Sequence, residues 1–297
     1  MIIVTGANGQ LGRLIVEALL TRVPAGRIGV SVREPEKAKE LADRGVRVRR
    51  GTFAEPAALA GAFEGATQVL IVSVDAMGEA AVAQHRAAIE AAATAGARRI
   101  LYTSHMGASP ASRFEACRDH AAVEDALRAS GMPFTALRNG FYATSAVQFL
   151  GRAVPSGQLA LPADGPVSWT AHADLAEAAA VILADEGRFE GPTPPLTADR
   201  AYDFAAIAQL VGQITGRAMS RLVVPAEAFR AGMLSNGVPE ALADGLLGIF
   251  AASQAGEFAA IDPTLTELIG RAPVGLETVL RDRLAEPSPA QPALDES

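Results

Sequence analysis

The first twelve residues, MIIVTGANGQLG (1–12), decide the fold class. An apolar stretch typical of a buried strand leads directly into a turn with three glycines, and a stretch typical of a helix follows. In such a unit Gly6 allows the tight turn, Gly9 lets the backbone approach a pyrophosphate, and Gly12 lets the helix pack closely on the strand. The stretch therefore predicts a dinucleotide-binding Rossmann fold with phosphates at the helix N-terminus. The alternative is a glycine-rich turn without a ligand.

The rest of the first half repeats this alternation of strand and helix. Strands connected through helices are parallel and carry helices on both faces, so the sequence predicts an α/β, doubly wound sheet. The arginine-rich strand is expected at an edge because the other strands are apolar on both sides. The expected strands are 2–5, 28–32, 46–50, 69–73, 100–103 and 134–137, and the expected helices are 10–22, 35–44, 56–63, 79–95 and 115–130.

The second half loses this regular alternation. We predict a dinucleotide-binding domain at 1–151, to which later segments return, a smaller mixed α/β cap that binds substrate at 152–283, and a disordered tail at 284–297. The elements expected here are a strand at 222–224 and helices at 139–151, 174–185, 226–234, 239–255 and 265–270.

Composition excludes several classes of protein. The 297 residues carry a net charge of −7, which argues against nonspecific nucleic-acid binding. The single cysteine, Cys117, cannot form an intramolecular disulfide, and no cluster of His, Cys and carboxylates has the spacing of a metal site. We see no signal peptide and no apolar run long enough to span a bilayer, so we expect a cytoplasmic protein that does not enter membranes.

The end of the second expected strand indicates which dinucleotide is bound. NAD-specific sites usually carry an acidic residue here, whereas this chain has Arg33, whose guanidinium would pair with the 2′-phosphate of NADPH. Lys37, one turn into the next helix, would add a second positive charge, while Glu34 is expected to point away. The alternative is a solvated surface pair without a ligand.

The loops after the next strands supply further candidates for the cofactor site. Thr52 and Phe53 follow the third strand and would flank the adenine. Ser73 and Val74 follow the fourth strand and would contact the ribose. The arginines of 46–50 are expected mainly at a solvated edge.

The catalytic pattern Tyr-x-x-x-Lys, which many ketone reductases of this fold use, is absent from the helix at 115–130. His120 and Glu124 occupy that spacing and share a helix face. His120 is the candidate for proton transfer, with packing or cofactor contact as the alternative. Quinones and cationic dyes can accept hydride without a strongly placed acid, whereas unactivated ketones cannot, so the sequence favours the former.

Several stretches together resemble the NmrA-like atypical short-chain dehydrogenases, especially bacterial NADPH-dependent quinone and triphenylmethane reductases. The resemblance covers about residues 1–283. Its most specific parts are DHAAVE (119–124) and LRNGFY (137–142). Other matching stretches are VTGANGQLG (4–12), VREPEKA (32–38), YTS (102–104), GVPEAL (237–242) and LTELIGR (265–271).

The resemblance implies roles for individual residues. It places a pyrophosphate on the glycine loop, the 2′-phosphate on Arg33, and the nicotinamide and substrate beside LRNGFY. The residues after YTS depart from the family, which puts the substrate in doubt. The cofactor residues are Gly6, Asn8, Gly9, Gln10, Leu11, Ser73, Thr103, Ser104, Asn139 and Gly140, and the residues near substrate are His105, Met106, Phe141, Tyr142 and Trp169. The aromatic rings among them either stack on a flat substrate or belong to the core.

These observations favour a reductase that passes hydride from NADPH to a quinone or similar planar, electron-poor acceptor. Two alternatives remain. One is a non-enzymatic NADP(H)-binding redox sensor, and the other is a reductase or isomerase of a biosynthetic pathway. The sequence is compatible with a homodimer.

Overall fold

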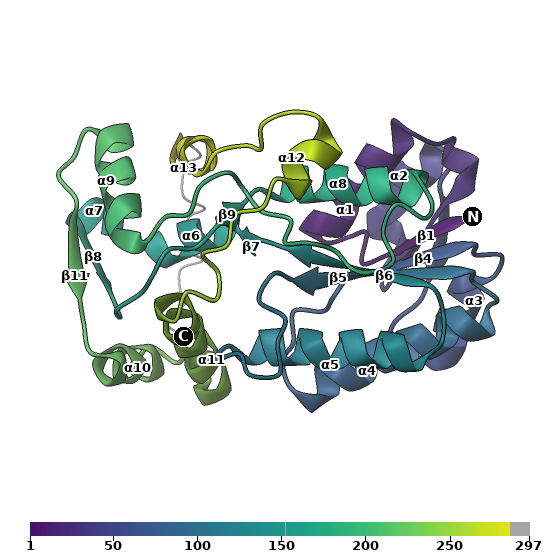
Figure 1. Cartoon of the computed structure of the whole chain (residues 1–297), viewed down its shortest axis with the longest axis horizontal. Coiled ribbons are helices and arrows are strands. Elements are labelled where there is room, and N and C mark those ends of the chain that lie inside the picture. The colour runs from purple at the N-terminus through teal and green to yellow at the C-terminus, as the bar shows by residue number, and fades with distance from the viewer. Residues whose placement is uncertain (152, 286–297) are drawn as a thin grey trace, which may run out of the picture.

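A central sheet of seven parallel strands organises the computed structural model, which describes residues 1–151 and 153–285 (Figure 1). The first half supplies six strands in the order 3-2-1-4-5-6, which is the Rossmann order. The strands, in spatial order, are β10 (Gly191–Pro192), β6 (Phe134–Asn139), β5 (Arg99–His105), β4 (Gln68–Ile71), β1 (Ile2–Thr5), β2 (Ile28–Val32) and β3 (Arg47–Arg50). The predicted fold class is confirmed.

Helices cover both faces of this sheet (Figure 1). One face carries α1 (Gln10–Leu20), α2 (Lys39–Asp43), α8 (His172–Ala184) and α12 (Thr264–Ile269). The other carries α3 (Pro56–Phe63), α4 (Glu79–Thr94) and α5 (Glu115–Ala129). The predicted helix at 35–44 is split, because Pro35–Ala38 forms a 3-10 turn before α2. Strand β3 lies at the edge, as its arginines indicated.

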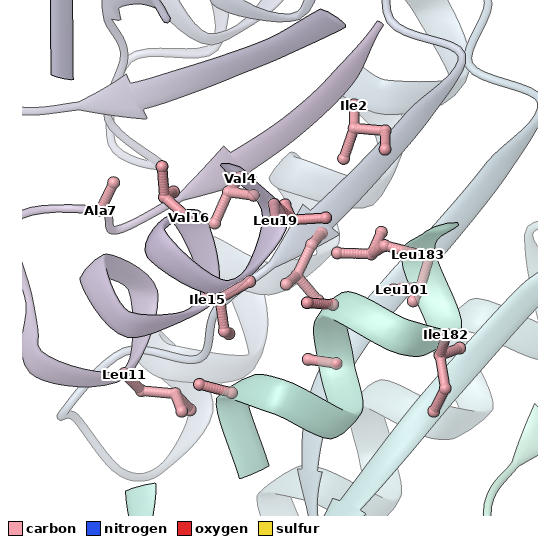
Figure 2. Close-up of a cluster of buried hydrophobic side chains, with 14 of the residues drawn as sticks. Ile2, Val4, Ala7, Leu11, Ile15, Val16, Leu19, Leu101, Ile182 and Leu183 are labelled. Atoms are coloured by element: carbon pink, nitrogen blue, oxygen red, sulfur yellow. The ribbon is translucent and has the colours of Figure 1, made fainter. Parts of the chain in front are cut away.

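The apolar layer between α1 and α8 is built by residues far apart in the sequence. Ile15 and Leu19 of α1 are fully buried, and Ile182 and Leu183 of α8 pack into the same cluster (Figure 2). Alanines on α8 let the two helices approach closely. Helix α8 and strand β10 therefore return from the second half to complete the sheet and its cover.

The remaining elements gather beyond the carboxyl ends of the strands (Figure 1). A second apolar cluster holds them together, with Phe204, Phe250 and Phe258 at 0–2% exposure. They are β7 (Phe141–Tyr142), α6 (Ala143–Leu150), α7 (Ala153–Ser156), β8 (Gln158–Leu161), β9 (Trp169–Thr170), α9 (Phe204–Thr215), β11 (Ser220–Val223), α10 (Ala226–Ser235), α11 (Glu240–Gln254) and α13 (Leu276–Ala285).

Three expectations for this half differ from the structure. The helix expected at 139–151 begins only at Ala143, because Phe141 and Tyr142 pair with β9. Helix α9 was not predicted. It begins at Phe204, and the carboxylate of its N-cap residue, Asp203, accepts a hydrogen bond from the Ala206 amide. The tail expected to be disordered from 284 is helical through 285, and its part at 286–297 lies outside the described residues.

A buried ion pair fixes the small sheet of β8 and β11. Arg221 of β11 lies 3.1 Å from the Asp164 carboxylate, and both side chains are 9% exposed. The guanidinium also donates to the carbonyls of Leu161 and Pro162, so its charge is well solvated by protein. Within 1–151 and 153–285, none of the helices has the length and apolar character needed to cross a bilayer.

Candidate functional site

The glycine loop has the geometry of a phosphate-binding turn. Gly6 has a φ of +65°, a conformation that favours glycine, and its amide donates to the Ser31 carbonyl at 3.1 Å. A Cβ at Gly12 would lie 2.4 Å from the Gly6 carbonyl oxygen, so only glycine allows α1 to start this close to the loop. Helix α1 begins at Gln10, and its free N–H groups offer a site for an anion.

The residues predicted to bind the adenosine end lie at the same edge of the sheet, after β2 and β3. Arg33 is exposed, and no described residue forms a hydrogen bond or ion pair with its guanidinium. The Asn8 amide donates to the Glu34 carbonyl at 2.9 Å, which ties Arg33's segment to the glycine loop. Arg33 is therefore available for a phosphate beside that loop.

Lys37 differs from the prediction. Its ammonium lies 2.7 Å from the carboxylate of Glu34, so Glu34 does not simply point away from the site. Because this pair offsets the lysine charge, Lys37 is a weaker phosphate ligand than Arg33.

Hydrogen bonds hold the loop after β4 beside the end of β5. The Ser73 amide donates to Thr103 Oγ1 at 2.8 Å, and the Val74 amide donates to His85 Nε2 at 3.2 Å. Phe53, from the loop after β3, lies 6.0 Å from the His85 ring, and its neighbour Thr52 accepts a weak local hydrogen bond. The residues predicted to contact the adenine and the ribose of the cofactor therefore lie together, at the carboxyl ends of the parallel strands.

The segment after β6 lies next to these loops, at the carboxyl ends of the parallel strands. A Cβ at Gly140 would lie 2.2 Å from Thr170 Oγ1, so glycine is required where the chain passes from β6 to β7 beside β9. The Oδ1 atom of Asn139 is buried without a hydrogen-bond partner among the described residues, which leaves an acceptor for a ligand amide. Burial raises the pKa of Tyr142 to about 12 despite a hydrogen bond with Asn139, so this phenol stays protonated.

His120 lies on α5, with its Nδ1 2.7 Å from the Tyr102 hydroxyl oxygen and its ring stacked on His105 at 6.1 Å. Burial lowers the pKa of His120 well below 6.5, and nearby His105 and His85 lower it further. The ring is therefore neutral at pH 7. It can orient a ligand through a hydrogen bond, but it is a poor source of protons.

The pair of His120 and Glu124 does not work as the sequence suggested. Glu124 is 1% exposed and forms a two-pronged ion pair with Arg138 at 2.8 and 3.0 Å. Its Oε1 also accepts from the Ser104 hydroxyl at 2.7 Å. Glu124 is thus held by the fold on both sides of α5's contact with the sheet. The Ser104 hydroxyl is bound to this carboxylate, so any contact of Ser104 with the cofactor stays a prediction for the rest of the residue.

The predicted substrate aromatics belong mainly to the core. Trp169 is 1% exposed and its indole donates to the Tyr202 carbonyl at 2.9 Å, which favours the alternative that this ring belongs to the core. Met106 and Phe141 are 7% and 8% exposed and pack in the same cluster. His105 is partly exposed and its Nδ1 lies 3.2 Å from the Cys117 sulfur. Of the five, His105 and Tyr142 keep the most surface for a ligand.

Sequence reasoning missed Tyr102, His85 and Arg138 as parts of this site. Residues two apart on a strand share a face, so Tyr102 could have been placed beside Ser104 and against α5. Arg138, the partner of Glu124, lies on the next strand, β6, so no spacing in the sequence connects these two residues. Among the described residues no group of three or more His, Cys, Asp or Glu side chains could hold a metal ion.

His85 should make the fold sensitive to mild acid. Burial lowers its pKa from 6.5 to about 4, so between these values the unfolded chain binds a proton that the folded chain does not. Stability is therefore lost as pH falls through this window. We expect His85→Gln to reduce the drop in unfolding free energy between pH 7 and pH 5 by about 2 kcal/mol, measured by urea unfolding. Equal pH dependence in both proteins would contradict this assignment.

Comparisons with known proteins agree with this geometry. The model of the NmrA-like family matches residues 1–278. Quinone oxidoreductase 2 of Escherichia coli (strain K12) is 34% identical over 273 residues, which are 91% of this chain and 94% of that protein.

Two solved structures extend the likeness to three dimensions. The NADPH complex of an NADPH-dependent quinone oxidoreductase from Escherichia coli has a TM-score of 0.89 and 33% identity, over 96% of this chain and 100% of that one. The NADP(H) complex of Citrobacter sp. triphenylmethane reductase has a TM-score of 0.87 and 33% identity, over 95% of this chain and 99% of that one. With a family model that covers nearly its whole length, the chain belongs to the NmrA-like family.

Proposed function

We propose that the protein is an NADPH-dependent reductase that transfers hydride to a quinone or similar planar, electron-poor acceptor. The observation that carries the proposal is the glycine turn, where a Cβ at Gly12 would collide with the backbone of Gly6, beside the guanidinium of Arg33, which pairs with no residue that the structure describes. The names of the relatives, quinone oxidoreductase and triphenylmethane reductase, support the class of acceptor.

NADPH would supply the hydride, and the chain would bind and orient it. Gly6, Gly9 and the start of α1 would hold the pyrophosphate, and Arg33 the 2′-phosphate. Asn139 would accept a hydrogen bond from the carboxamide through its free Oδ1. Because Tyr142 keeps its proton and His120 is neutral, solvent would provide the proton that the reduced acceptor needs.

Arg33 should set the preference between the two nicotinamide cofactors. We expect Arg33→Ala to weaken NADPH binding about tenfold, because one charge-assisted contact to a phosphate is lost, and to leave NADH binding nearly unchanged. Titration of both cofactors checks this result. Lys37→Ala is the matched control, with a smaller effect because Glu34 already pairs with that lysine. Equal losses for NADPH and NADH in Arg33→Ala would show that the residue does not bind the 2′-phosphate.

The reductase is tested by NADPH oxidation with a panel of quinones and cationic dyes, followed by the near-ultraviolet absorbance of NADPH. Rapid oxidation with one of these acceptors would support the proposal. Tight NADPH binding without oxidation by any acceptor would instead favour a redox sensor or a pathway enzyme with another substrate. Failure to bind either cofactor would overturn the whole assignment.

We also propose the setting in which the enzyme works: the cytoplasm, as a homodimer, without nucleic-acid partners. Residues 152–283 would form the substrate-binding cap, apart from α8, β10 and α12, which lie with the Rossmann sheet. Size-exclusion chromatography with light scattering would test the dimer.

A further inference from the structure

A hydrogen bond from Tyr102 determines which nitrogen of the His120 ring carries the hydrogen. Among the described residues, His120 Nδ1 is the only hydrogen-bond partner of the Tyr102 hydroxyl, at 2.7 Å. Burial raises the pKa of Tyr102 well above 10, so the phenol keeps its proton and donates it to Nδ1. A neutral imidazole that accepts at Nδ1 carries its single hydrogen on Nε2. His120 is therefore a donor at Nε2.

The Nε2 atom of His120 is available to a ligand. The residue is partly exposed, and within 1–151 and 153–285 no side chain or carbonyl accepts a hydrogen bond from this nitrogen. It also differs from Nε2 of the neighbouring His105, which is buried. An N–H group that the fold neither pairs nor buries can donate to a carbonyl oxygen.

The strand order indicates where the nicotinamide end of a dinucleotide would lie. In a Rossmann sheet the dinucleotide crosses the carboxyl ends of the strands at the point where the strand order reverses, which here is between β1 and β4. The glycine loop and Arg33 follow β1 and β2 and would take the adenosine half. The nicotinamide half would therefore lie over the carboxyl ends of β4, β5 and β6.

Direct contacts hold His120 at this end of the sheet. Its ring stacks on His105, the last residue of β5, at 6.1 Å, and His105 is in register with Asn139 at the end of β6. The preceding residue, Asp119, accepts a hydrogen bond of 2.6 Å from the Gly78 amide, in the loop after β4. His120 is thus held against the strand ends over which the nicotinamide and its hydride acceptor would meet.

We propose that His120 donates a hydrogen bond from Nε2 to a carbonyl oxygen of the electron acceptor, and that Tyr102 is the positioning residue that keeps the hydrogen on Nε2. This inference rests on the proposed reductase function. Hydride from NADPH brings two electrons and one hydrogen to the acceptor and leaves NADP⁺, so negative charge develops on the acceptor oxygen, which the N–H group stabilises. His120 keeps its hydrogen, and solvent supplies the proton that completes the hydroquinone.

Two substitutions and their combination separate this role from packing. Tyr102→Phe removes only the hydroxyl and keeps the ring between His85 and His120. His120→Gln keeps an N–H donor, but its amide has no tautomer for Tyr102 to set. We expect Tyr102→Phe to lower kcat with 2-methyl-1,4-naphthoquinone about 3- to 10-fold and to leave the Kd for NADPH within about twofold of the wild type.

The combined variant shows whether Tyr102 acts through the histidine. Adding Tyr102→Phe to His120→Gln should cause no further loss of kcat, because the tautomer no longer matters. The same loss from Tyr102→Phe in both backgrounds would mean that the hydroxyl acts on packing, and it would overturn the positioning role.

Nitrogen NMR of the His120 ring tests the proposal without turnover. In the NADP⁺-loaded wild type we expect the hydrogen on Nε2 and a bare Nδ1, a mixture of tautomers in Tyr102→Phe, and a change in the Nε2 shift when 2-methyl-1,4-naphthoquinone is added. Hydrogen on Nδ1 in the wild type, a single unchanged tautomer in Tyr102→Phe, or no response of Nε2 to the quinone would overturn the proposal. A shift already complete with NADP⁺ alone would also overturn it, because the donor would then belong to the cofactor.

These spectra distinguish this inference from the reductase itself. A protein that gives the expected shifts but oxidises no NADPH would support the donor and contradict the reductase. A protein that oxidises NADPH with the quinone but gives none of these shifts would support the reductase and contradict the donor.

Discussion

Replacing Gly12 by alanine should weaken NADPH binding about 10- to 100-fold and lower the unfolding free energy by about 1–3 kcal/mol. The new Cβ would lie 2.4 Å from the Gly6 carbonyl oxygen and 2.8 Å from the Gly6 carbonyl carbon. Both atoms are backbone, so either α1 or the phosphate-binding turn must move. Because α1 also packs on α8, the turn is the part that we expect to yield.

We expect Gly12→Ala to lower the unfolding free energy, which is opposite to the usual effect of a glycine-to-alanine change in a helix. Glycine-to-alanine changes inside helices normally stabilise by up to about 1 kcal/mol. Gly61→Ala in α3 is the control, because nothing lies within 4 Å of its added Cβ. NADPH titration and thermal unfolding of both variants check the prediction. If Gly12→Ala binds NADPH as the wild type does, the glycine loop is not the pyrophosphate site.

Removing the carboxylate of Glu124 should cost about 3–5 kcal/mol of unfolding free energy. The carboxylate is nearly inaccessible to solvent, and it joins α5 to β6 through Arg138 and to β5 through Ser104. This ion pair raises the pKa of Arg138. An arginine stays protonated even without a partner, so the guanidinium keeps its charge when the carboxylate is removed. Glu124→Ala therefore leaves a partly buried cation without its counter-ion.

The neighbour Asp125 provides the control. Its carboxylate lies 2.5 Å from Arg128, but its side chain is 75% exposed, so we expect Asp125→Ala to change stability by less than about 0.5 kcal/mol. Urea unfolding of the two variants at pH 7 measures the difference. Similar stabilities for both would mean that the Glu124–Arg138 pair contributes little to the fold.

Local signals explain why the first half was predictable. The strands at Ile2–Thr5 and Ile28–Val32 and the helix at Pro56–Phe63 match the sequence-based boundaries, because apolar runs, glycines and a proline mark them directly. The glycine loop and Arg33 could be predicted for the same reason, because each follows directly after a strand that the sequence marks clearly.

The sequence was least informative where distant segments meet. Trp169 looks like a substrate aromatic in the sequence, but β9 pairs with β7 and places its ring in the core. Ser104 follows Thr103 on β5, yet its hydroxyl donates to Glu124 of α5, which also binds Arg138 of β6. A pocket of about 490 Å³ between α6 and α11 joins residues about a hundred positions apart, such as Ser145 and Leu246, so no spacing in the sequence could indicate it.

The return of α8 and β10 to the sheet has a consequence for synthesis on the ribosome. When residues 1–151 have emerged, the apolar face of α1 and the outer edge of β6 still lack the partners that cover them. Exposed apolar surface and unpaired strand edges favour aggregation of incomplete chains. The nascent Rossmann unit must therefore wait for about forty further residues, through Pro192, before it can close, and truncated chains that end before that point are the ones that chaperones would need to protect.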